Sequence, residues 1–268
     1  MSRTQNVPSN DSAPARLLKG VQEQGVRIIT ARTAAEILRT DVPTARTTLA
    51  RLVERGWLIR QSRGVFSLPA ERSQGVTILV ADARLGSRPH YVAFRTALQL
   101  QGMTLHSWRE IQFAAKQPTR IKMPDLAPQV RVVQLSPNRF FGMTWTDVVG
   151  ERVSVSDPEK SVIDALSHLD LVGGAEVVLQ ALWLGKERIS QQRLLEYAEG
   201  FHSPATARRL GYLLELLGLY PAVSSALNLT VASKEYIPLE SHQPGSYRDR
   251  RWRIESVSPE ELLQGLES

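Results

Sequence analysis

Apolar residues recur at helical spacing in three stretches between residues 13 and 56, and polar residues fill the positions between them. This pattern predicts three short helices. The apolar stripes consist of Ala15, Leu18 and Val21 in the first stretch, AAEIL in the second, and Ala45, Leu49, Leu52 and Val53 in the third. We expect Thr33 to cap the second helix, with Glu36 completing a capping box. Asp41 and Pro43 mark the start of the third helix.

A hairpin pattern follows the third predicted helix. The stretch WLIRQSRGVFSL, residues 57–68, alternates apolar and polar side chains around a turn at residues 62–64, which predicts two short strands. We expect Trp57 to pack on the helices rather than to stack on bases. Two helices joined by a short turn and followed by a hairpin are typical of the winged helix-turn-helix. We therefore expect this domain at residues 13–75, after a disordered tail at residues 1–12.

The rest of the chain predicts strands first and helices afterwards. A helix with a buried face is expected over RPHYVAFRTALQLQG, and an antiparallel sheet or meander over IQFAA, QVRVVQL, RFFGMTW and RVSVS. Capping residues at Asp157, Ser190 and Ser203 then mark helix starts in a part with four or five short helices. The stretches EYIPL and WRIES predict a small return to strand.

The expected fold class is α+β: an N-terminal winged helix-turn-helix, followed by a mixed domain of antiparallel strands and a C-terminal helical part. The second domain spans residues 76–268, with the sheet at 76–156 and the mainly helical part at 157–268. No apolar run reaches the roughly 18 residues of a membrane span. The first residues are polar and lack the apolar core of a signal peptide. We therefore expect a cytoplasmic protein that does not bind a membrane.

Charge is distributed unevenly along the chain. Residues 1–75 contain twelve Arg or Lys and six Asp or Glu, a net charge of +6, whereas residues 76–268 contain 21 of each sign. Eleven of the twelve cations in the first part are Arg, which can bind phosphate and guanine through two hydrogen bonds at once. A basic module joined to a neutral body indicates binding to double-stranded DNA at one end of the chain.

The third predicted helix carries most of the candidate DNA contacts. Thr and Arg side chains occupy the face opposite its apolar stripe, and both can hydrogen-bond to base edges or phosphate. Arg side chains of the hairpin would meet a flanking phosphate or the minor groove. The predicted DNA-binding residues are Thr44, Arg46, Thr47, Thr48 and Arg51 in the helix and Arg60 and Arg63 in the hairpin. A winged helix can also bind proteins, and the charge distribution favours DNA over that alternative.

The stretch SVSDPEKSVIDAL raises the alternative of a metal-dependent nuclease, because Asp157, Glu159 and Lys160 lie close together. A metal site needs carboxylates that converge on one point. Here Pro158 separates the two acids and favours the first turn of a helix. Asp157 as N-cap and Glu159 in the first turn would both stabilise the positive helix end. Asp164 is placed to pair with Lys160 four residues earlier. This spacing favours a helix start over a catalytic site.

Other signs of catalysis or cofactor binding are missing from the sequence. The five histidines lack the spacing of a zinc site, no glycine-rich phosphate loop or nucleophile motif occurs, and there is no cysteine. We therefore predict no catalytic residues, no metal and no cofactor, and a protein that is not an enzyme.

Several stretches occur together in one order: RGVFSLP, HYVAFRTALQLQGMT, SPNRFFGMTW, VSVSDPEKSVIDAL, LVGGAEVVLQAL and SPATARRLGYLLELLG. With the predicted N-terminal domain, they cover about residues 15 to 255. In order and spacing the chain resembles the AbiEi-type antitoxins of bacterial abortive-infection (type IV toxin–antitoxin) systems, also described as viral-defence transcriptional regulators. It departs from them at residues 101–104, Gln-Gly-Met-Thr, where relatives often carry a histidine.

The resemblance implies a protein with two roles. Its winged helix would bind inverted repeats in its own promoter and repress the operon. Its C-terminal domain would counteract a nucleotidyltransferase-like toxin encoded next to it, without a stable complex between the two proteins. The alternative is a stand-alone winged-helix transcriptional regulator that has no toxin partner and whose body binds a ligand or dimerises.

Overall fold

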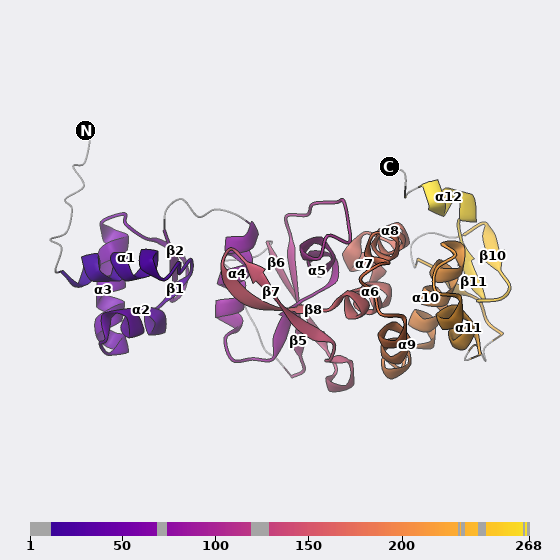
Figure 1. Cartoon of the computed structure of the whole chain (residues 1–268), viewed down its shortest axis with the longest axis horizontal. Coiled ribbons are helices and arrows are strands. Elements are labelled where there is room, and N and C mark those ends of the chain that lie inside the picture. Colours follow the sequence, from indigo (N-terminus) through magenta and orange to yellow (C-terminus); the bar gives the residue numbers. More distant parts are fainter. Residues whose placement is uncertain are drawn as a thin grey trace. The chain divides into compact units, whose positions relative to one another are not determined.

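The computed structural model describes residues 12–68, 74–118, 129–229, 231, 234–240, 245–264 and 266. The expected tail therefore lies outside the described residues, apart from Ser12. The described chain contains helices together with three separate sheets, so the expected α+β class is confirmed (Figure 1). By internal contacts the chain divides into two compact units. The first comprises residues 1–88, 121–130 and 145–153, and the second comprises the remainder.

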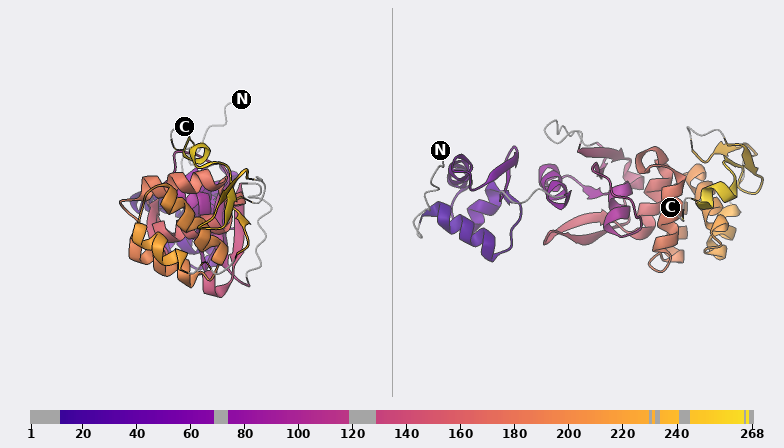
Figure 2. Two further views of the ribbon diagram at one scale, coloured as in Figure 1. Left: turned by 90° about the vertical axis from the view of Figure 1, so that its right-hand side faces the viewer. Right: turned by 90° about the horizontal axis from the view of Figure 1, so that it is seen from above.

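Described residues 12–68 form three helices and one small sheet. In order these are α1 (Ala13–Glu23), β1 (Ile29–Thr30), α2 (Ala31–Leu38), α3 (Val42–Glu54), β2 (Ile59–Ser62) and β3 (Val65–Ser67). Strand β3 lies between β1 and β2 and is antiparallel to both, so the predicted hairpin is confirmed. The right-hand view of Figure 2 shows the three helices, in indigo, as one cluster. Their core is formed by Leu17, Val21, Ile29, Leu49, Leu52 and Leu58, with Trp57 packed against it as expected.

Two details of the N-terminal prediction were wrong. Thr30 rather than Thr33 caps α2, and its Oγ1 accepts the backbone N–H of Thr33 at 3.1 Å. The N-cap of α2 therefore lies three residues before the predicted position. The reason is that Thr30 ends strand β1, and the chain turns directly from strand into helix. In α1 the buried leucine is Leu17, whereas Leu18 is only partly buried.

Residues 74–85 form a helix, α4 (Gln74–Leu85), although they lie largely in the segment expected to be sheet. The sequence VTILV is an apolar run that suits a strand as well as a helix. The tertiary structure selects the helix and buries Val76, Leu79 and Val80 at helical spacing. Arg84 in the last turn donates a hydrogen bond from Nη1 to the carbonyl oxygen of Arg63 at 2.9 Å, which connects α4 to the turn of the β2–β3 hairpin.

A five-stranded sheet follows, in the order β6-β5-β4-β8-β7. The elements of this segment are β4 (His90–Val92), α5 (Phe94–Leu100), β5 (Ile111–Lys116), β6 (Val130–Leu135), the 3-10 turn η1 (Pro137–Arg139), β7 (Met143–Val148) and β8 (Glu151–Ser156). The sheet is not the predicted antiparallel meander, because β4 pairs with β8 in parallel, with Val92 opposite Val155. Two local predictions also change. Tyr91 lies in strand β4 rather than in the helix, and Phe140 and Phe141 precede β7 instead of forming part of it.

The chain beyond residue 157 is mainly helical, as predicted. Its helices are α6 (Pro158–Ser167), α7 (Leu169–Val172), α8 (Ala175–Gly185), α9 (Gln191–Gly200), α10 (Pro204–Leu216), α11 (Pro221–Asn228) and α12 (Pro259–Gln264). These described helices outnumber the four or five expected. Asp157, Ser190 and Ser203 each cap a helix through the side chain, which confirms all three predicted starts.

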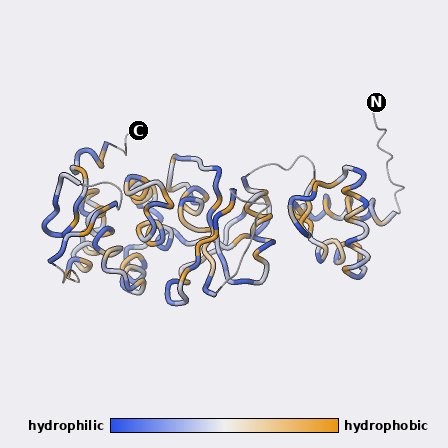
Figure 3. Tube along the Cα trace, turned by 180° about the vertical axis from the view of Figure 1, so that it is seen from behind, coloured by the Kyte–Doolittle hydropathy of each residue, from blue (hydrophilic) through white to orange (hydrophobic). Residues whose placement is uncertain are grey.

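A small three-stranded sheet completes the second unit. It consists of β9 (Ile237–Pro238), β10 (Tyr247–Asp249) and β11 (Ile254–Ser256), and it contains both stretches predicted to return to strand. A large hydrophobic core of this unit runs from Tyr91 to Leu262 and includes buried residues of α5, α6, α8 and α10. Figure 3 shows hydrophobic segments, in orange, recurring along these helices between hydrophilic ones. No helix in the described part of the chain is long and apolar enough to cross a membrane.

Candidate nucleic-acid interface and a buried charge network

Helix α3 has one buried and one exposed face. Ala45, Leu49 and Leu52 are buried in the N-terminal core. Of the residues predicted to bind DNA, those exposed on α3 are Thr44, Arg46, Thr47 and Arg51. Thr48 is the exception, because only 5% of it is exposed and its hydroxyl donates to the carbonyl oxygen of Thr44 at 3.3 Å. Thr48 therefore belongs to the packing face and is removed from the set of candidate contacts.

The N-terminal turn of α3 is held by Asp41. The Oδ1 atom of Asp41 accepts the backbone N–H of Thr44 at 2.7 Å, and its Oδ2 atom accepts the hydroxyl hydrogen of Thr44 at 3.1 Å. The bond from the Thr44 backbone is the main cause that lowers the pKa of Asp41 below its usual value, and the bond from the Thr44 hydroxyl acts in the same direction. Asp41 is therefore ionised at neutral pH. One turn further along, the hydroxyl of Thr47 donates to the carbonyl oxygen of Pro43 at 3.3 Å.

The arginines of α3 are available to a ligand. Among the described residues, neither Arg46 nor Arg51 forms an ion pair or a side-chain hydrogen bond. In the hairpin, Arg60 on β2 and Arg63 in the turn are both exposed. Gly64 supports this tight turn, since its φ of 81° lies in the left-handed region that favours glycine. Helix α3 and the hairpin share one core, which contains Leu49, Leu52 and Leu58.

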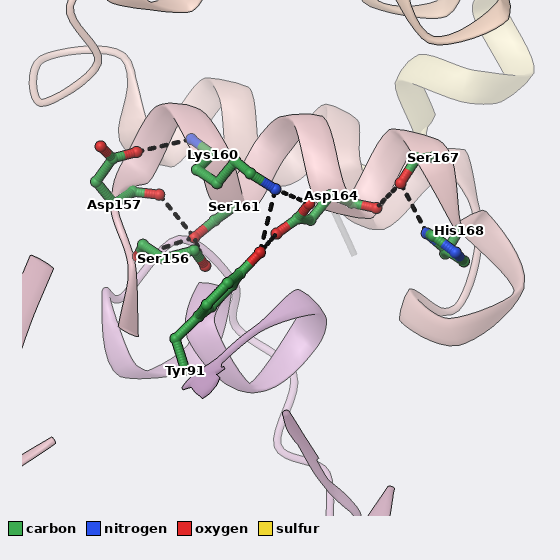
Figure 4. A network of polar contacts seen from close by, with 8 residues as sticks. All are labelled: Tyr91, Ser156, Asp157, Lys160, Ser161, Asp164, Ser167 and His168. Carbon is green, nitrogen blue, oxygen red and sulfur yellow. Dashed lines mark hydrogen bonds and ion pairs between the residues drawn. The ribbon is translucent and has the colours of Figure 1, made fainter. Parts of the chain in front are cut away.

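A second cluster of polar residues lies inside the other unit, around helix α6 (Figure 4). Lys160 and Asp164 form an ion pair one turn apart, and neither side chain is exposed to solvent. Tyr91 reaches them from strand β4, and its hydroxyl donates to Oδ2 of Asp164 at 2.9 Å. The ammonium group of Lys160 also donates to the Tyr91 oxygen at 3.2 Å and lies near the rings of Phe141 and Phe201. Figure 4 shows the three polar side chains converging on one point.

Burial dominates the ionisation of this network. It lowers the pKa of Lys160, while the neighbouring Asp164 carboxylate acts in the opposite direction. Burial likewise raises the pKa of Tyr91 well above its usual value, and Asp164 adds to that shift. Asp164 thus accepts hydrogen bonds from both Lys160 and Tyr91.

Asp157 and Glu159 accept hydrogen bonds from different groups, although Arg193 lies close to both carboxylates, at 3.8 Å from Asp157 and 3.7 Å from Glu159. Oδ1 of Asp157 accepts the backbone N–H of Lys160 at 2.8 Å, and its Oδ2 accepts the hydroxyl of Tyr197 at 2.9 Å. Glu159 is fully buried, and its Oε1 accepts the backbone N–H of Ser190 at 2.6 Å. Asp157 thus caps the start of α6, whereas Glu159 bonds to the backbone at the start of α9. Throughout the described segments no group of three His, Cys, Asp or Glu residues could hold a metal ion.

The sequence pattern missed the burial of these charges. The spacing of Lys160 and Asp164 correctly predicted their pairing, yet such pairs usually lie on a solvated helix face. Their burial depends on Tyr91, which is 69 residues away from Lys160. The sequence pattern also did not indicate the contacts of Arg208, whose guanidinium donates to the backbone carbonyl oxygens of Glu235, Trp252 and Arg253.

Comparison with known proteins adds information about the fold alone. No protein-family model matches the sequence, and no curated protein matches it either. Among solved structures, the RV2827C protein from Mycobacterium tuberculosis is similar, with a TM-score of 0.73 and 16% sequence identity. The similarity covers 98% of this chain and 96% of that one. The fold of this chain is therefore similar to that of a solved protein.

Proposed function

We propose that the chain binds double-stranded DNA through a winged helix-turn-helix formed by residues 13–75. In this proposal α2 and α3 are the helix-turn-helix, α3 is the recognition helix, and the β2–β3 hairpin is the wing. The observation that carries the proposal is the exposed face of α3, where Arg46 and Arg51 have no partner within the described chain. The net charge of +6 in residues 1–75, against an even balance elsewhere, supports it.

The chemistry of these side chains suits a DNA duplex. A guanidinium can donate two parallel hydrogen bonds to O6 and N7 of guanine or to a phosphate. The candidate contacts that remain are Thr44, Arg46, Thr47 and Arg51 on α3 and Arg60 and Arg63 in the wing. The wing arginines suit a phosphate or the minor groove beside the site that α3 contacts.

We further propose that the protein is an antitoxin of the AbiEi type. It would repress its own operon at promoter inverted repeats and counteract a nucleotidyltransferase-like toxin through the part that follows residue 75. This proposal depends on the ordered sequence blocks that resemble that family. The alternative of a stand-alone regulator differs in gene context, because an antitoxin gene adjoins a nucleotidyltransferase gene.

Gel-shift titration on a fragment of the chain's own promoter tests DNA binding. Arg46→Ala and Arg51→Ala should each weaken binding about tenfold or more, since a direct base or phosphate contact contributes about 1–3 kcal/mol. Arg109→Ala provides a matched control, because Arg109 is an exposed arginine of the other unit. Unchanged binding by both α3 variants would refute α3 as the recognition helix.

Growth of cells that express the neighbouring nucleotidyltransferase tests the antitoxin role. Co-expression of this chain should restore growth. Continued growth arrest, with both proteins present at normal levels, would refute that role and leave the stand-alone regulator.

A further inference from the structure

We propose that the exposed face of α3 distinguishes bases by the polarity of its hydrogen-bonding groups. Thr44 and Thr47 present only acceptors and therefore select an amino group, on adenine or cytosine. Arg51 presents only donors and selects guanine. This inference rests on the proposed DNA binding and adds to it the class of bases that each part of the helix contacts.

The hydroxyl directions are fixed by groups within the protein. A threonine hydroxyl can normally rotate, and it donates or accepts according to its partner. Here the hydrogen of Thr44 is committed to Asp41, which is ionised and can only accept. The hydrogen of Thr47 is committed to the carbonyl oxygen of Pro43, which also can only accept. Both hydroxyls are exposed and retain only lone pairs for a ligand.

The base edges of the major groove divide in the same way. Adenine offers the N6 amino group and cytosine the N4 amino group, whereas guanine offers the acceptors O6 and N7 and thymine the acceptor O4. An acceptor on the protein therefore matches adenine or cytosine at the position it faces. The negative charge of Asp41, exposed beside Thr44, reinforces this choice because it repels the acceptor edges of guanine and thymine.

Helical spacing sets the separation of the two kinds of contact. Residues 44, 47 and 51 follow one flank of α3, since they are three and four positions apart. The rise from residue 44 to residue 51 is roughly 10 Å, because each residue advances the helix about 1.5 Å. That length corresponds to about three base pairs at roughly 3.4 Å each. The operator should thus contain guanine within about three base pairs of the selected adenine or cytosine.

The test compares base preferences in a promoter fragment whose half-site is randomised one position at a time. Thr47→Val keeps the shape of the side chain and removes the acceptor, so the preference for adenine or cytosine at one position should fall about tenfold. Asp41→Asn keeps the helix cap, since Asn caps as well as Asp does. Its amide nitrogen would donate to the oxygen of Thr44 and free the hydroxyl hydrogen. The preference opposite Thr44 should therefore move towards guanine or thymine.

The control is Thr33→Val on α2, which should leave every preference unchanged. Melting curves from circular dichroism would confirm that the variants are folded. If the wild-type protein binds the fragment but Asp41→Asn and Thr47→Val keep its preferences, the polarity inference is wrong while DNA binding stands. If the wild-type protein binds no promoter fragment with sequence preference, the proposed function fails and the inference fails with it.

Discussion

Two lysine–carboxylate pairs with the same spacing differ in their surroundings. Lys19 and Glu23 lie 3.7 Å apart on α1 with side chains that are 76% and 63% exposed. Lys160 and Asp164 on α6 are fully buried. An exposed pair contributes at most about 1 kcal/mol, because water screens the charges. A buried pair gains a stronger attraction, but both ions have lost their hydration, so its net contribution is small. Removing one member of the buried pair, by contrast, lowers the stability strongly, because the other charge stays buried without a partner.

The two pairs lead to a quantitative prediction. Lys160→Met should lower the free energy of unfolding by about 3–5 kcal/mol, because Asp164 remains buried without its counter-ion. The double variant Lys160→Met with Asp164→Leu should recover most of that loss. Lys19→Met is the control and should change stability by less than about 1 kcal/mol. Urea denaturation of the four proteins measures these differences, and a double variant as unstable as Lys160→Met would contradict the argument.

Tyr197 gives a prediction for alkaline pH. Burial is the main cause that raises its pKa from 10.0 to about 12, and the bond to Asp157 adds to the shift. A raised pKa means that the folded state favours the neutral phenol. The stabilisation is therefore complete below pH 10 and is lost as the pH rises from 10 to about 12.

The variant Tyr197→Phe should lack this pH-dependent contribution to the free energy of unfolding. The stability difference between wild type and variant should narrow above pH 10, as measured by urea denaturation at several pH values. The other buried tyrosines titrate in both proteins and cancel in the comparison. A difference that stays constant up to pH 12 would show that Tyr197 does not titrate in this way.

At the scale of elements, two helical glycines have opposite surroundings. A methyl group added to Gly211 on α10 would lie 2.0 Å from the Trp252 ring, whereas nothing lies within 4 Å of one added to Gly200 on α9. Trp252 cannot move aside easily. It is fully buried, and its Nε1 donates to Oε2 of Glu215 at 2.7 Å. The absence of a side chain at Gly211 is thus what lets α10 approach the indole.

Gly211→Ala should therefore destabilise the protein by about 1–3 kcal/mol or more through overpacking. Gly200→Ala should be neutral, or should stabilise it by up to about 1 kcal/mol, because alanine restricts the unfolded chain. Thermal unfolding followed by circular dichroism compares the two variants. Similar melting temperatures for both would mean that α10 and Trp252 do not pack as closely as described.

The elements that could be predicted from sequence are those with local causes. Asp157, Ser190 and Ser203 cap their helices through neighbouring backbone N–H groups, so a few residues determine each start. Strand β4 could not be predicted in the same way, because Tyr91 and Val92 are placed by pairing with β5 and β8, which lie far away in the chain. The candidate interface was likewise predicted only in part. Its exposed arginines could be predicted from the helical pattern. The burial of Thr48 could not, because it depends on how far α3 is rotated about its axis against the core.

At the scale of the whole molecule, two hydrophobic cores of the described chain lie in different parts of the sequence. One is formed within residues 13–68 and the other within residues 91–266. The excess positive charge belongs to the part that contains the first core. Surface substitutions on α3 should therefore leave the second core unaffected.

This separation predicts that the two proposed roles can be divided. A variant with both Arg46→Ala and Arg51→Ala should lose repression of a reporter driven by its promoter, yet still restore growth to cells expressing the toxin. Both proteins would be expressed from an unrelated promoter, and their levels compared by immunoblot. Loss of both roles at equal protein levels would show that toxin counteraction requires bound DNA.

The enclosure of Lys160 also has a consequence for chemical labelling. The sequence contains six lysines, and reagents that acylate amines react only with an amine that water can reach. In the native protein the amine of Lys160 is shielded by Asp164, Tyr91 and the aromatic rings around it. Its modification must wait for that part of the molecule to open, so its acylation rate reports how often the second core opens. Mass spectrometry of the acylated protein can therefore follow this opening without any change to the sequence.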